Sequence, residues 1–265
     1  MKTQDRSLEG KVAVVAGAGP GIGRAAALAL ARDGADVAVV ARRGPPLEAL
    51  AAEIAEETGR RVVPVTADLG DLAQCESLVE RTVDTLGRLD ALVNVATLGG
   101  PRSAVADMDW EGYLESVHFN VVATMKLCSL AAARMKAHSG GSIVNIGSLS
   151  STTLELKLSR YTSTKAAMVV ASKTMAREVG RDGIRVNVVT PGYTSGEGLD
   201  RMFREMAEHT GGDAEELSAR AARETALHRH VDPEDIAEAV LFLVSERGRN
   251  ITGVELHVNA GLWIG

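Results

Sequence analysis

The chain has 265 residues, of which 45% are hydrophobic and 24% are charged, and its formal net charge is −6. These values suit one globular domain over residues 1–265, and the negative charge disfavours nucleic acid as a partner. No apolar run approaches the roughly 20 residues that span a bilayer, and the polar residues 1–7 do not have the pattern of a signal peptide or an anchor. Cys75 and Cys128 lack metal-ligand spacing. We therefore expect a cytoplasmic protein with reduced thiols, no membrane segment and no metal site.

The first elements predict a phosphate-binding turn. Residues 11–16 form a continuous apolar run, which is typical of a strand buried on both faces of a parallel sheet. Gly17, Gly19, Gly21 and Gly23 follow, and a helix-forming segment comes directly after them. Glycines let the backbone approach a pyrophosphate, and the N-terminus of the helix attracts its charge. The order of strand, glycine turn and helix therefore indicates a dinucleotide-binding unit.

The next expected strand, residues 36–41, is followed by Arg42 and Arg43. An acidic residue near this position binds a ribose 2′-hydroxyl, whereas arginine suits a 2′-phosphate. We therefore expect NADP to be preferred. The alternative is NAD, with Arg42 and Arg43 as ordinary solvated loop charges.

Strands and helices go on alternating toward the C-terminus. Further strands are expected at 61–67, 89–96, 141–147, 184–190 and 254–258, and helices around 47–55 and at 71–87, 109–137, 160–180 and 233–246. Seven strands alternating with helices indicate an α/β protein with a doubly wound, mainly parallel sheet of seven strands. This is the Rossmann fold in a single domain.

Two segments depart from the alternation. The helix at 109–137 is apolar almost all round in its second half, so a second subunit is expected to cover the side that the sheet leaves open. We therefore expect a homodimer or homotetramer formed through helices 109–137 and 160–180. Residues 193–231 contain no expected strand, and their two short helices, 198–209 and 214–226, make this segment a candidate substrate lid.

Tyr161 and Lys165 are the clearest candidates for catalytic chemistry. They are four residues apart, so their side chains share one face of a helix. A nearby ammonium favours the phenolate and lowers the pKa of a tyrosine, which lets the phenol exchange a proton with a substrate oxygen. Ser148, just after the strand at 141–147, could hold the same oxygen. Tyr-x-x-x-Lys pairs also occur by chance on helix surfaces, so the interpretation depends on the rest of the chain.

Taken together, these motifs resemble the short-chain dehydrogenase/reductase family in its single-domain form, over residues 10–261. Asn120, Ser148 and the Tyr-x-x-x-Lys pair follow the glycine turn in the family's order, with the serine thirteen residues before the tyrosine. The resemblance implies an oxidoreductase that transfers a hydride between NAD(P) and a ketone or secondary alcohol, with Tyr161 as general acid and base. It also implies that Lys165 lowers the tyrosine pKa and binds the nicotinamide ribose. Ser148 would position the substrate oxygen, and Asn120 would hold a water that connects Lys165 to solvent.

The remaining ligand-binding residues are assigned from the same resemblance and from the apolar character of the loops. The expected cofactor-binding residues are Gly17, Gly19, Gly21, Ile22, Gly23, Arg42, Arg43, Asp68, Leu69, Asn94, Ala96, Tyr161, Lys165, Pro191, Gly192 and Thr194. The expected substrate pocket consists of Ser148, Leu149, Leu154, Leu158, Tyr193 and Met202, with Thr97, Leu98 and Leu156 nearby. This lining is largely apolar, so we expect a hydrophobic substrate, such as an alicyclic, steroid-like or 3-oxoacyl compound.

Several positions depart from the family pattern. Ala16 replaces the threonine before the first glycine, and Pro20 replaces the basic residue that many NADP-dependent members carry. Thr97 replaces the last glycine of the Asn-Asn-Ala-Gly motif, which lies near the cofactor. Thr194 replaces an apolar residue, and Gly196 replaces a threonine. The four expected catalytic residues are all present.

Three other functions fit the sequence less well. A non-catalytic, nucleotide-binding regulatory protein with the same fold would be expected to lack part of the catalytic set, which is complete here. An epimerase or dehydratase of the extended relatives needs a larger C-terminal substrate domain. A methyltransferase does not explain Ser148, Tyr161 and Lys165 at their spacings. The regulatory protein stays the alternative to the oxidoreductase.

Overall fold

The computed structural model describes residues 7–138 and 140–264, which are built around a seven-stranded sheet. The strand order is β3-β2-β1-β4-β5-β6-β7, and every pair is parallel in this described part of the chain. The strands are β1 (Val12–Ala16), β2 (Asp36–Ala41), β3 (Val62–Thr66), β4 (Ala91–Asn94), β5 (Gly141–Ile146), β6 (Ile184–Pro191) and β7 (Glu255–Val258). The winding reverses between β1 and β4, so the expected doubly wound Rossmann fold is confirmed.

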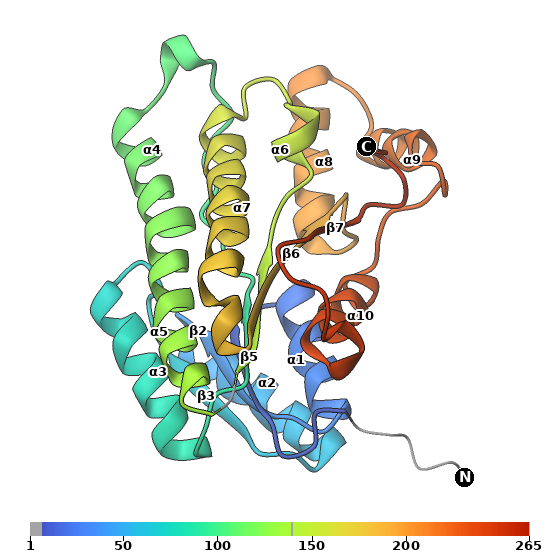
Figure 1. Cartoon of the computed structure of the whole chain (residues 1–265). Coiled ribbons are helices and arrows are strands. Elements are labelled where there is room, and N and C mark those ends of the chain that lie inside the picture. Colours follow the sequence, from blue (N-terminus) through green and yellow to red (C-terminus); the bar gives the residue numbers. More distant parts are fainter. Residues whose placement is uncertain (1–6, 139, 265) are drawn as a thin grey trace.

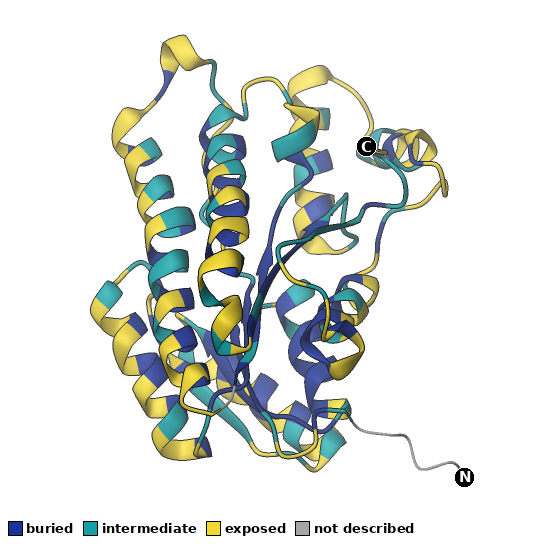
Figure 2. Ribbon diagram, in the orientation of Figure 1, coloured by how far each residue is buried: buried dark blue, intermediate teal, exposed yellow. Residues whose placement is uncertain are grey.

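Helices cover both faces of the sheet (Figure 1). One face carries α1 (Ile22–Arg32), α2 (Gly44–Thr58) and α10 (Pro233–Val244), and the other carries α3 (Leu72–Leu86), α5 (Thr124–Lys136) and α7 (Ser159–Val179). Alternate strand residues point to opposite faces, so Val15 joins the first core and Val14 the second. Figure 2 shows the inner strands buried almost throughout, which explains their continuous apolar runs, whereas the edge strands β3 and β7 are mostly of intermediate exposure. Shorter elements are α6 (Ser150–Thr153), η1 (Val105–Asp107), η3 (Gly180–Asp182) and η4 (Glu246–Gly248).

Several helices begin at aspartates whose side chains bind the first free N–H groups, and two of them illustrate the pattern. Asp71 accepts hydrogen bonds from the backbone of Ala73 and Gln74 at the start of α3. Asp213 accepts one from the backbone N–H of Glu216, at 2.8 Å, at the start of α9 (Ala214–Glu224). The unpaired N–H groups of a helix start are satisfied in this way, so both boundaries follow from local sequence.

The helix expected at 109–137 is divided into three pieces. They are α4 (Trp110–Val117), the π-helical turn η2 (His118–Ala123) and α5. A π turn accommodates an extra residue within a helix and frequently marks a functional site. The apolar periodicity continues through the turn, so the sequence predicted an unbroken helix.

By length and composition alone, the 27-residue run Trp110–Lys136 could cross a membrane, which the sequence analysis did not expect. Core helices of soluble proteins satisfy the same criterion. In this structure, the α5 part of the run buries Leu127, Cys128, Ala131 and Met135 in the core beside the sheet. The apolar residues on this face of α5 therefore pack within the fold.

The segment 193–231 contains α8 (Glu197–Thr210) and α9, as expected, and Figure 1 shows both beyond the carboxyl ends of the strands. It is not free of β structure, because Thr194 and Val231 form an isolated parallel bridge. Leu199 and Phe203 of α8 pack against Ala221 of α9. The two helices therefore have a small core of their own.

Candidate active site

A groove of about 510 Å³ opens where the winding of the sheet reverses, at the carboxyl ends of β1 and β4. Ligands of doubly wound sheets bind at this point of the fold. The groove is lined by Gly17, Gly19, Ala41, Arg42, Arg43, Ala67, Leu69, Ala96, Thr97 and Phe119. Several expected cofactor-binding residues, from separate segments of the chain, therefore meet in one place.

The glycine turn fits a pyrophosphate. Gly17 has a φ of 102°, and a Cβ atom there would collide with the backbone of Ala96. A Cβ atom at Gly23 would collide with the carbonyl of Gly17. Gly21, with a φ of 87°, precedes α1, and no side chain caps this helix. The N-terminus of α1 can therefore present backbone N–H groups to an anion.

Arg42 and Arg43 lie exposed where β2 ends, beside the groove. Neither forms an ion pair with another residue of the described chain. Asp68 is exposed after β3, and its Oδ1 accepts a hydrogen bond from the backbone N–H of Gly70 at 2.9 Å. The ends of β2 and β3 therefore carry two positive charges and one negative charge that are exposed beside the groove.

Asn94 was expected to bind the cofactor, which stays a prediction, and its side chain lies beneath the groove. Its side chain is buried, and Nδ2 donates to Oδ1 of Asn145 at 2.7 Å and to Sγ of Cys128 at 3.2 Å. Nδ2 of Asn145 then donates to Oγ of Ser172 at 2.8 Å. The side chain of Asn94 therefore joins β4, β5 and α7 beneath the site instead of entering the groove.

Lys165 is a buried cation at the end of β5. Its side chain is part of α7, the residue is 4% exposed, and Nζ donates to the carbonyl of Ile146 at 2.8 Å. Nζ lies 5.9 Å from the centre of the Tyr161 ring, on the ring face, so the two side chains share one side of the helix as predicted. Burial lowers the pKa of Lys165 to about 8, because a low-dielectric environment disfavours the ammonium.

The pKa of Tyr161 is raised above its ordinary value, mainly by burial, which disfavours the phenolate. Hydrogen bonds with Ser148 and Thr97 act in the opposite direction. The expected lowering of this pKa by Lys165 is therefore wrong, because burial dominates the shift. Of the two hydroxyl groups that act to lower the pKa, only that of Ser148 was expected.

Asn120 lies in the π turn and is fixed by four hydrogen bonds. Its Oδ1 accepts from the backbone N–H of Leu98 at 2.8 Å and from the hydroxyl of Thr97 at 3.2 Å. Its Nδ2 donates to the carbonyl of Leu98 at 2.8 Å and to Oγ1 of Thr164 at 3.0 Å. The side chain therefore ties the loop after β4 to α7, beside Tyr161.

The expected substrate residues have different surroundings. Leu149 is buried and Leu158 is partly buried, whereas Leu154 is 68% exposed, in a left-handed conformation with a φ of 52°. Tyr193 and Met202 pack against the core between α8 and α9. Leu154 is therefore mainly exposed to solvent, and Met202 contributes to the packing of α8 against α9.

The segment after β6 is held by its backbone. The carbonyl of Pro191 accepts from the N–H of Leu149 at 3.2 Å, and the N–H of Gly192 donates to Val258 at 2.9 Å. Oγ1 of Thr194 donates to the carbonyl of Gly192 at 3.2 Å. The expected cofactor residues of this segment therefore lie next to the loop that follows β5, near Ser148.

Charged side chains near the pocket were missed by the sequence analysis. Arg102 pairs with Glu155 at 2.7 Å, which joins the loop after β4 to the loop before α7. Arg160 is buried next to Tyr161, and its Nε donates to Oγ of Ser116 at 2.7 Å. The sequence shows only that Arg160 is adjacent to Tyr161. It does not indicate the partners of Arg160 and Arg102, because Ser116 and Glu155 are distant from them along the chain.

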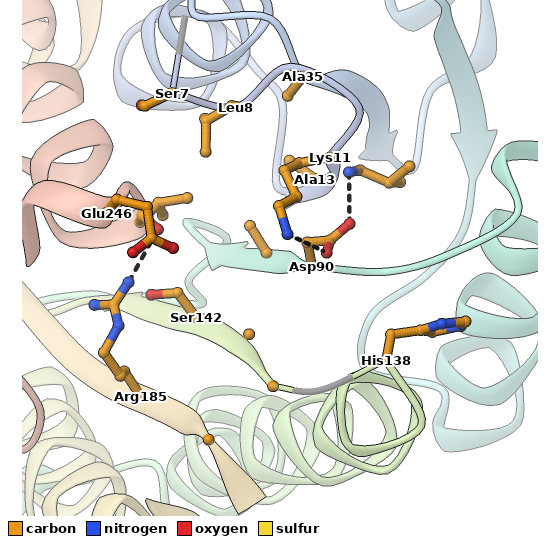
Figure 3. A pocket seen from close by; sticks show the side chains of 16 residues that line it. Ser7, Leu8, Lys11, Ala13, Ala35, Asp90, His138, Ser142, Arg185 and Glu246 are labelled. Carbon is orange, nitrogen blue, oxygen red and sulfur yellow. Dashed lines mark hydrogen bonds and ion pairs between the residues drawn. The ribbon is translucent and has the colours of Figure 1, made fainter. Parts of the chain in front are cut away.

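A second cavity, of about 210 Å³, lies at the opposite, amino edge of the sheet (Figure 3). Two of its charged side chains, Asp90 and Arg185, already have partners within the fold. Asp90 accepts from the backbone N–H of Val12 at 2.9 Å and pairs with Lys11 at 3.4 Å. Arg185 donates to the carbonyls of Val244 at 3.0 Å and Ser245 at 3.3 Å, at the end of α10. These contacts stabilise the fold, so the carboxyl-edge groove is the better candidate site.

Comparisons with known proteins agree with this geometry. A family model described as enoyl-(acyl carrier protein) reductase matches residues 17–263. The short chain dehydrogenase/reductase astE of Aspergillus oryzae is 35% identical over 260 residues, which cover 98% of this chain and 97% of that protein. The crystal structure of L-sorbose reductase from Gluconobacter frateurii, complexed with NADPH and L-sorbose, is 31% identical, covers 98% of both chains and has a TM-score of 0.92. Carveol dehydrogenase from Mycobacterium avium, in complex with NAD, is 28% identical over 97% of this chain and 98% of that chain, with a TM-score of 0.88.

The fold and the groove define a nicotinamide-dependent oxidoreductase with a Rossmann fold. The chain belongs to the short-chain dehydrogenase/reductase family, as its motifs suggested. It is therefore an NAD(P)-dependent enzyme that acts on CH–OH or C=O groups.

The buried charge of Lys165 predicts a pH-dependent stability. Its pKa is about 8 in the folded protein against 10.5 for the ordinary side chain, so the unfolded chain binds more protons between these values. The stability of the wild type relative to Lys165→Met should therefore rise as the pH rises through this window. Urea unfolding at a series of pH values measures the difference. Lys136→Met, at an exposed lysine, is the control, and a difference that falls with pH would contradict the assignment.

Proposed function

We propose that this enzyme transfers a hydride between a nicotinamide cofactor, with NADP preferred, and a ketone or secondary alcohol, with Tyr161 as the general acid and base. The observation that carries the proposal is that Tyr161, Ser148 and the buried ammonium of Lys165 come together after the end of β5. The hydroxyl of Ser148 acts to lower the pKa of the Tyr161 phenol, and Nζ of Lys165 lies 5.9 Å from the centre of the tyrosine ring. All three lie at the carboxyl edge of the sheet, on which the groove with the glycine turn also opens.

In the direction of reduction, each residue has a separate task. Ser148 donates a hydrogen bond to the substrate oxygen, and Tyr161 gives that oxygen a proton as its negative charge develops. Lys165 holds the ribose hydroxyls near the nicotinamide, and its charge stabilises the phenolate that forms. Asn120 anchors the loop beside the tyrosine and borders a water path to Lys165. The cofactor supplies or accepts the hydride.

The proposed substrate is hydrophobic, such as an alicyclic, steroid-like or 3-oxoacyl compound. Leu149 and Leu158 support an apolar inner surface, and the segment 193–231 would serve as the lid over it. The Arg102–Glu155 pair gives the rim a polar edge, so a substrate with an apolar body and one polar end suits the site. L-sorbose is the ligand of one neighbour, and carveol is named in another, so a panel must include sugars and apolar alcohols.

The preference for NADP rests on Arg42 and Arg43, which stand beside the ribose position without an acidic partner in the described chain. A 2′-phosphate would form charge-assisted hydrogen bonds with a guanidinium there. Ala41 offers no carboxylate to a 2′-hydroxyl, so the feature that selects NAD is missing from this position. We also propose a cytoplasmic location, in keeping with two free, buried cysteines.

We further propose a homodimer or homotetramer formed through α4, α5 and α7. Val122, in the π turn, is 44% exposed and Val170, on α7, is 64% exposed. Trp110 and Leu114 of α4 are exposed as well. A groove of about 480 Å³ runs between α5 and α7 and is lined partly by methionine and alanine. A second copy of the chain would remove these apolar surfaces from water.

Removal of the proposed acid and base tests the function. Tyr161→Phe should lower the turnover number about 10²- to 10⁴-fold, because the substrate oxygen loses its proton donor. Affinity for NADPH should stay near that of the wild type. The measurement is NADPH consumption with a panel of apolar ketones and small sugars, with Tyr113→Phe as the control. Tight binding of NADPH without turnover of any compound would favour the regulatory alternative, and turnover of sugars alone would contradict the hydrophobic substrate.

Removal of Arg42 tests the cofactor preference. Arg42→Ala should weaken NADPH binding about 10- to 100-fold through the loss of a charge-assisted contact, and should leave NADH binding unchanged. Fluorescence titration with both cofactors measures the affinities, and the double variant Arg42→Ala/Arg43→Ala should lose more. Arg81→Ala, at an exposed arginine of α3, is the matched control. Equal losses for NADPH and NADH would argue against a 2′-phosphate site.

A charge in the proposed interface tests the assembly. The wild type should have the mass of a dimer or tetramer at micromolar concentration in light scattering, and Val170→Glu should lower that mass. If the variant still assembled, its buried interface would have to hold an unpaired carboxylate, which is costly. Leu227→Glu replaces an equally exposed side chain, 60% accessible, in the loop after α9, and should leave the mass unchanged. A monomeric wild type would refute the proposal.

A further inference from the structure

Arg160 is a buried cation that has no task in the proposed hydride transfer. It precedes Tyr161 on α7 and is 9% exposed, and its Nε donates to Oγ of Ser116 on α4 at 2.7 Å. Oγ of Ser116 donates in turn to the carbonyl of Gly99 at 3.3 Å. One buried hydroxyl group therefore connects the guanidinium on α7 to the loop after β4.

Two glycines make room for this side chain. A Cβ atom at Gly100, in the loop after β4, would lie 2.7 Å from Nε of Arg160, and a Cβ atom at Gly112, on α4, would collide with Nη1. Nη1 also lies 3.5 Å from Oδ2 of Asp109. The same aspartate caps α4 by accepting from the backbone N–H of Gly112 at 3.1 Å. The guanidinium is therefore enclosed between α4, α7 and the loop.

The loop after β4 is held at two neighbouring residues. Asn120 binds both backbone groups of Leu98, and Ser116, four residues earlier, binds the carbonyl of Gly99. Leu98 is thus fixed without Arg160. From Gly99 onward, the path of the loop depends on Ser116 and Arg160.

The loop after β4 in turn holds a second loop beside the proposed pocket. Arg102 pairs with Glu155 at 2.7 Å, and the backbone N–H of Ser103 donates to the carbonyl of Lys157 at 3.0 Å. The second loop, residues 154–158, comes directly before α7 and supplies two of the leucines that were expected to line the substrate pocket. A displacement of the first loop would therefore move this part of the pocket with it.

The second loop depends on such contacts because its backbone is strained. Leu154 has a φ of 52° and Lys157 has a φ of 62°, and this left-handed region costs free energy for residues other than glycine. Strained conformations persist only where the surrounding structure holds them in place. Here the loop after β4 provides that support, through the side chain of Glu155 and the carbonyl of Lys157.

We propose that Arg160 is a positioning residue for the substrate: it holds residues 99–103, and these hold residues 154–158 at the pocket. The proposal rests on the proposed oxidoreductase function, which assigns the substrate to that pocket. Burial of a guanidinium is costly, and an apolar side chain of similar volume in its place is often neutral for stability. Packing alone therefore gives little reason for an arginine at this position.

Replacement of Arg160 separates substrate binding from the chemical step. Arg160→Met nearly keeps the volume and removes the hydrogen bond to Ser116. For the compound turned over fastest in the panel of apolar ketones and small sugars, KM should rise about tenfold, while kcat and NADPH affinity should stay within about twofold of the wild type. Arg160→Lys, which keeps a donor for Ser116, should recover part of the loss. Arg81→Met, at an exposed arginine of α3, is the control.

Hydrogen–deuterium exchange tests the positioning without a substrate. In Arg160→Met, peptides that cover residues 99–103 and 154–158 should exchange faster than in the wild type, while peptides from the central strands β1 and β4 should be unchanged. Ser116→Ala should give the same pattern, because it removes the same connection from the side of α4. It also replaces Arg160→Met if that variant does not fold.

Four results would overturn the proposal. They are unchanged exchange in both loops, faster exchange throughout the sheet, an unchanged KM where turnover is measurable, and a loss confined to NADPH affinity. An enzyme that turns over no compound of the panel would refute the proposed function, while the exchange measurement would still decide whether Arg160 positions the two loops.

Discussion

The carboxyl edge of the sheet around Tyr161 depends on one buried charge, the ammonium of Lys165. It donates to the carbonyl of Ile146, which sets the position of α7 against the end of β5. Tyr161 lies one helical turn earlier, so the same contact places its ring beside the ammonium. Below it, the hydrogen bonds from Asn94 through Asn145 to Ser172 join β4, β5 and α7. The site is therefore rigid because its cation cannot move without losing a buried partner.

The π turn sets the second boundary of the site. It carries Asn120, whose amide binds both backbone groups of Leu98 and the hydroxyl of Thr164. The loop after β4 has no regular structure of its own around residue 98, so these contacts fix its path. Thr97 is consequently held beside Tyr161 by its neighbour along the chain. A local irregularity in one helix thus fixes the loop that carries Thr97 and Leu98.

Much of the fold follows from sequence because buried parallel strands and capped helices have local signals. The strand at 36–41, the glycine turn and the Tyr161–Lys165 pair are all of this kind. The π turn at His118–Ala123 has no such signal, because apolar side chains recur through it without a break. The raised pKa of Tyr161 was missed because spacing indicates a nearby charge, whereas burial depends on the whole fold. The expected cofactor contact of Asn94 came from a motif. The motif could not indicate the hydrogen-bond partners of its side chain, because they lie on other elements.

The two edges of the sheet differ in how their charges are used, and this difference identifies the site better than cavity shape does. At the amino edge, Asp90 and Arg185 bind neighbouring charges and backbone groups, so their interactions stabilise the fold itself. At the carboxyl edge, Arg42 is exposed without an acidic partner in the described residues, and the N-terminus of α1 is uncapped by any side chain. Such groups gain by binding a ligand of opposite charge, because no internal contact has to be broken first. The carboxyl edge of the sheet, whose charged groups have fewer partners within the fold, is thus the edge suited to binding an anionic ligand.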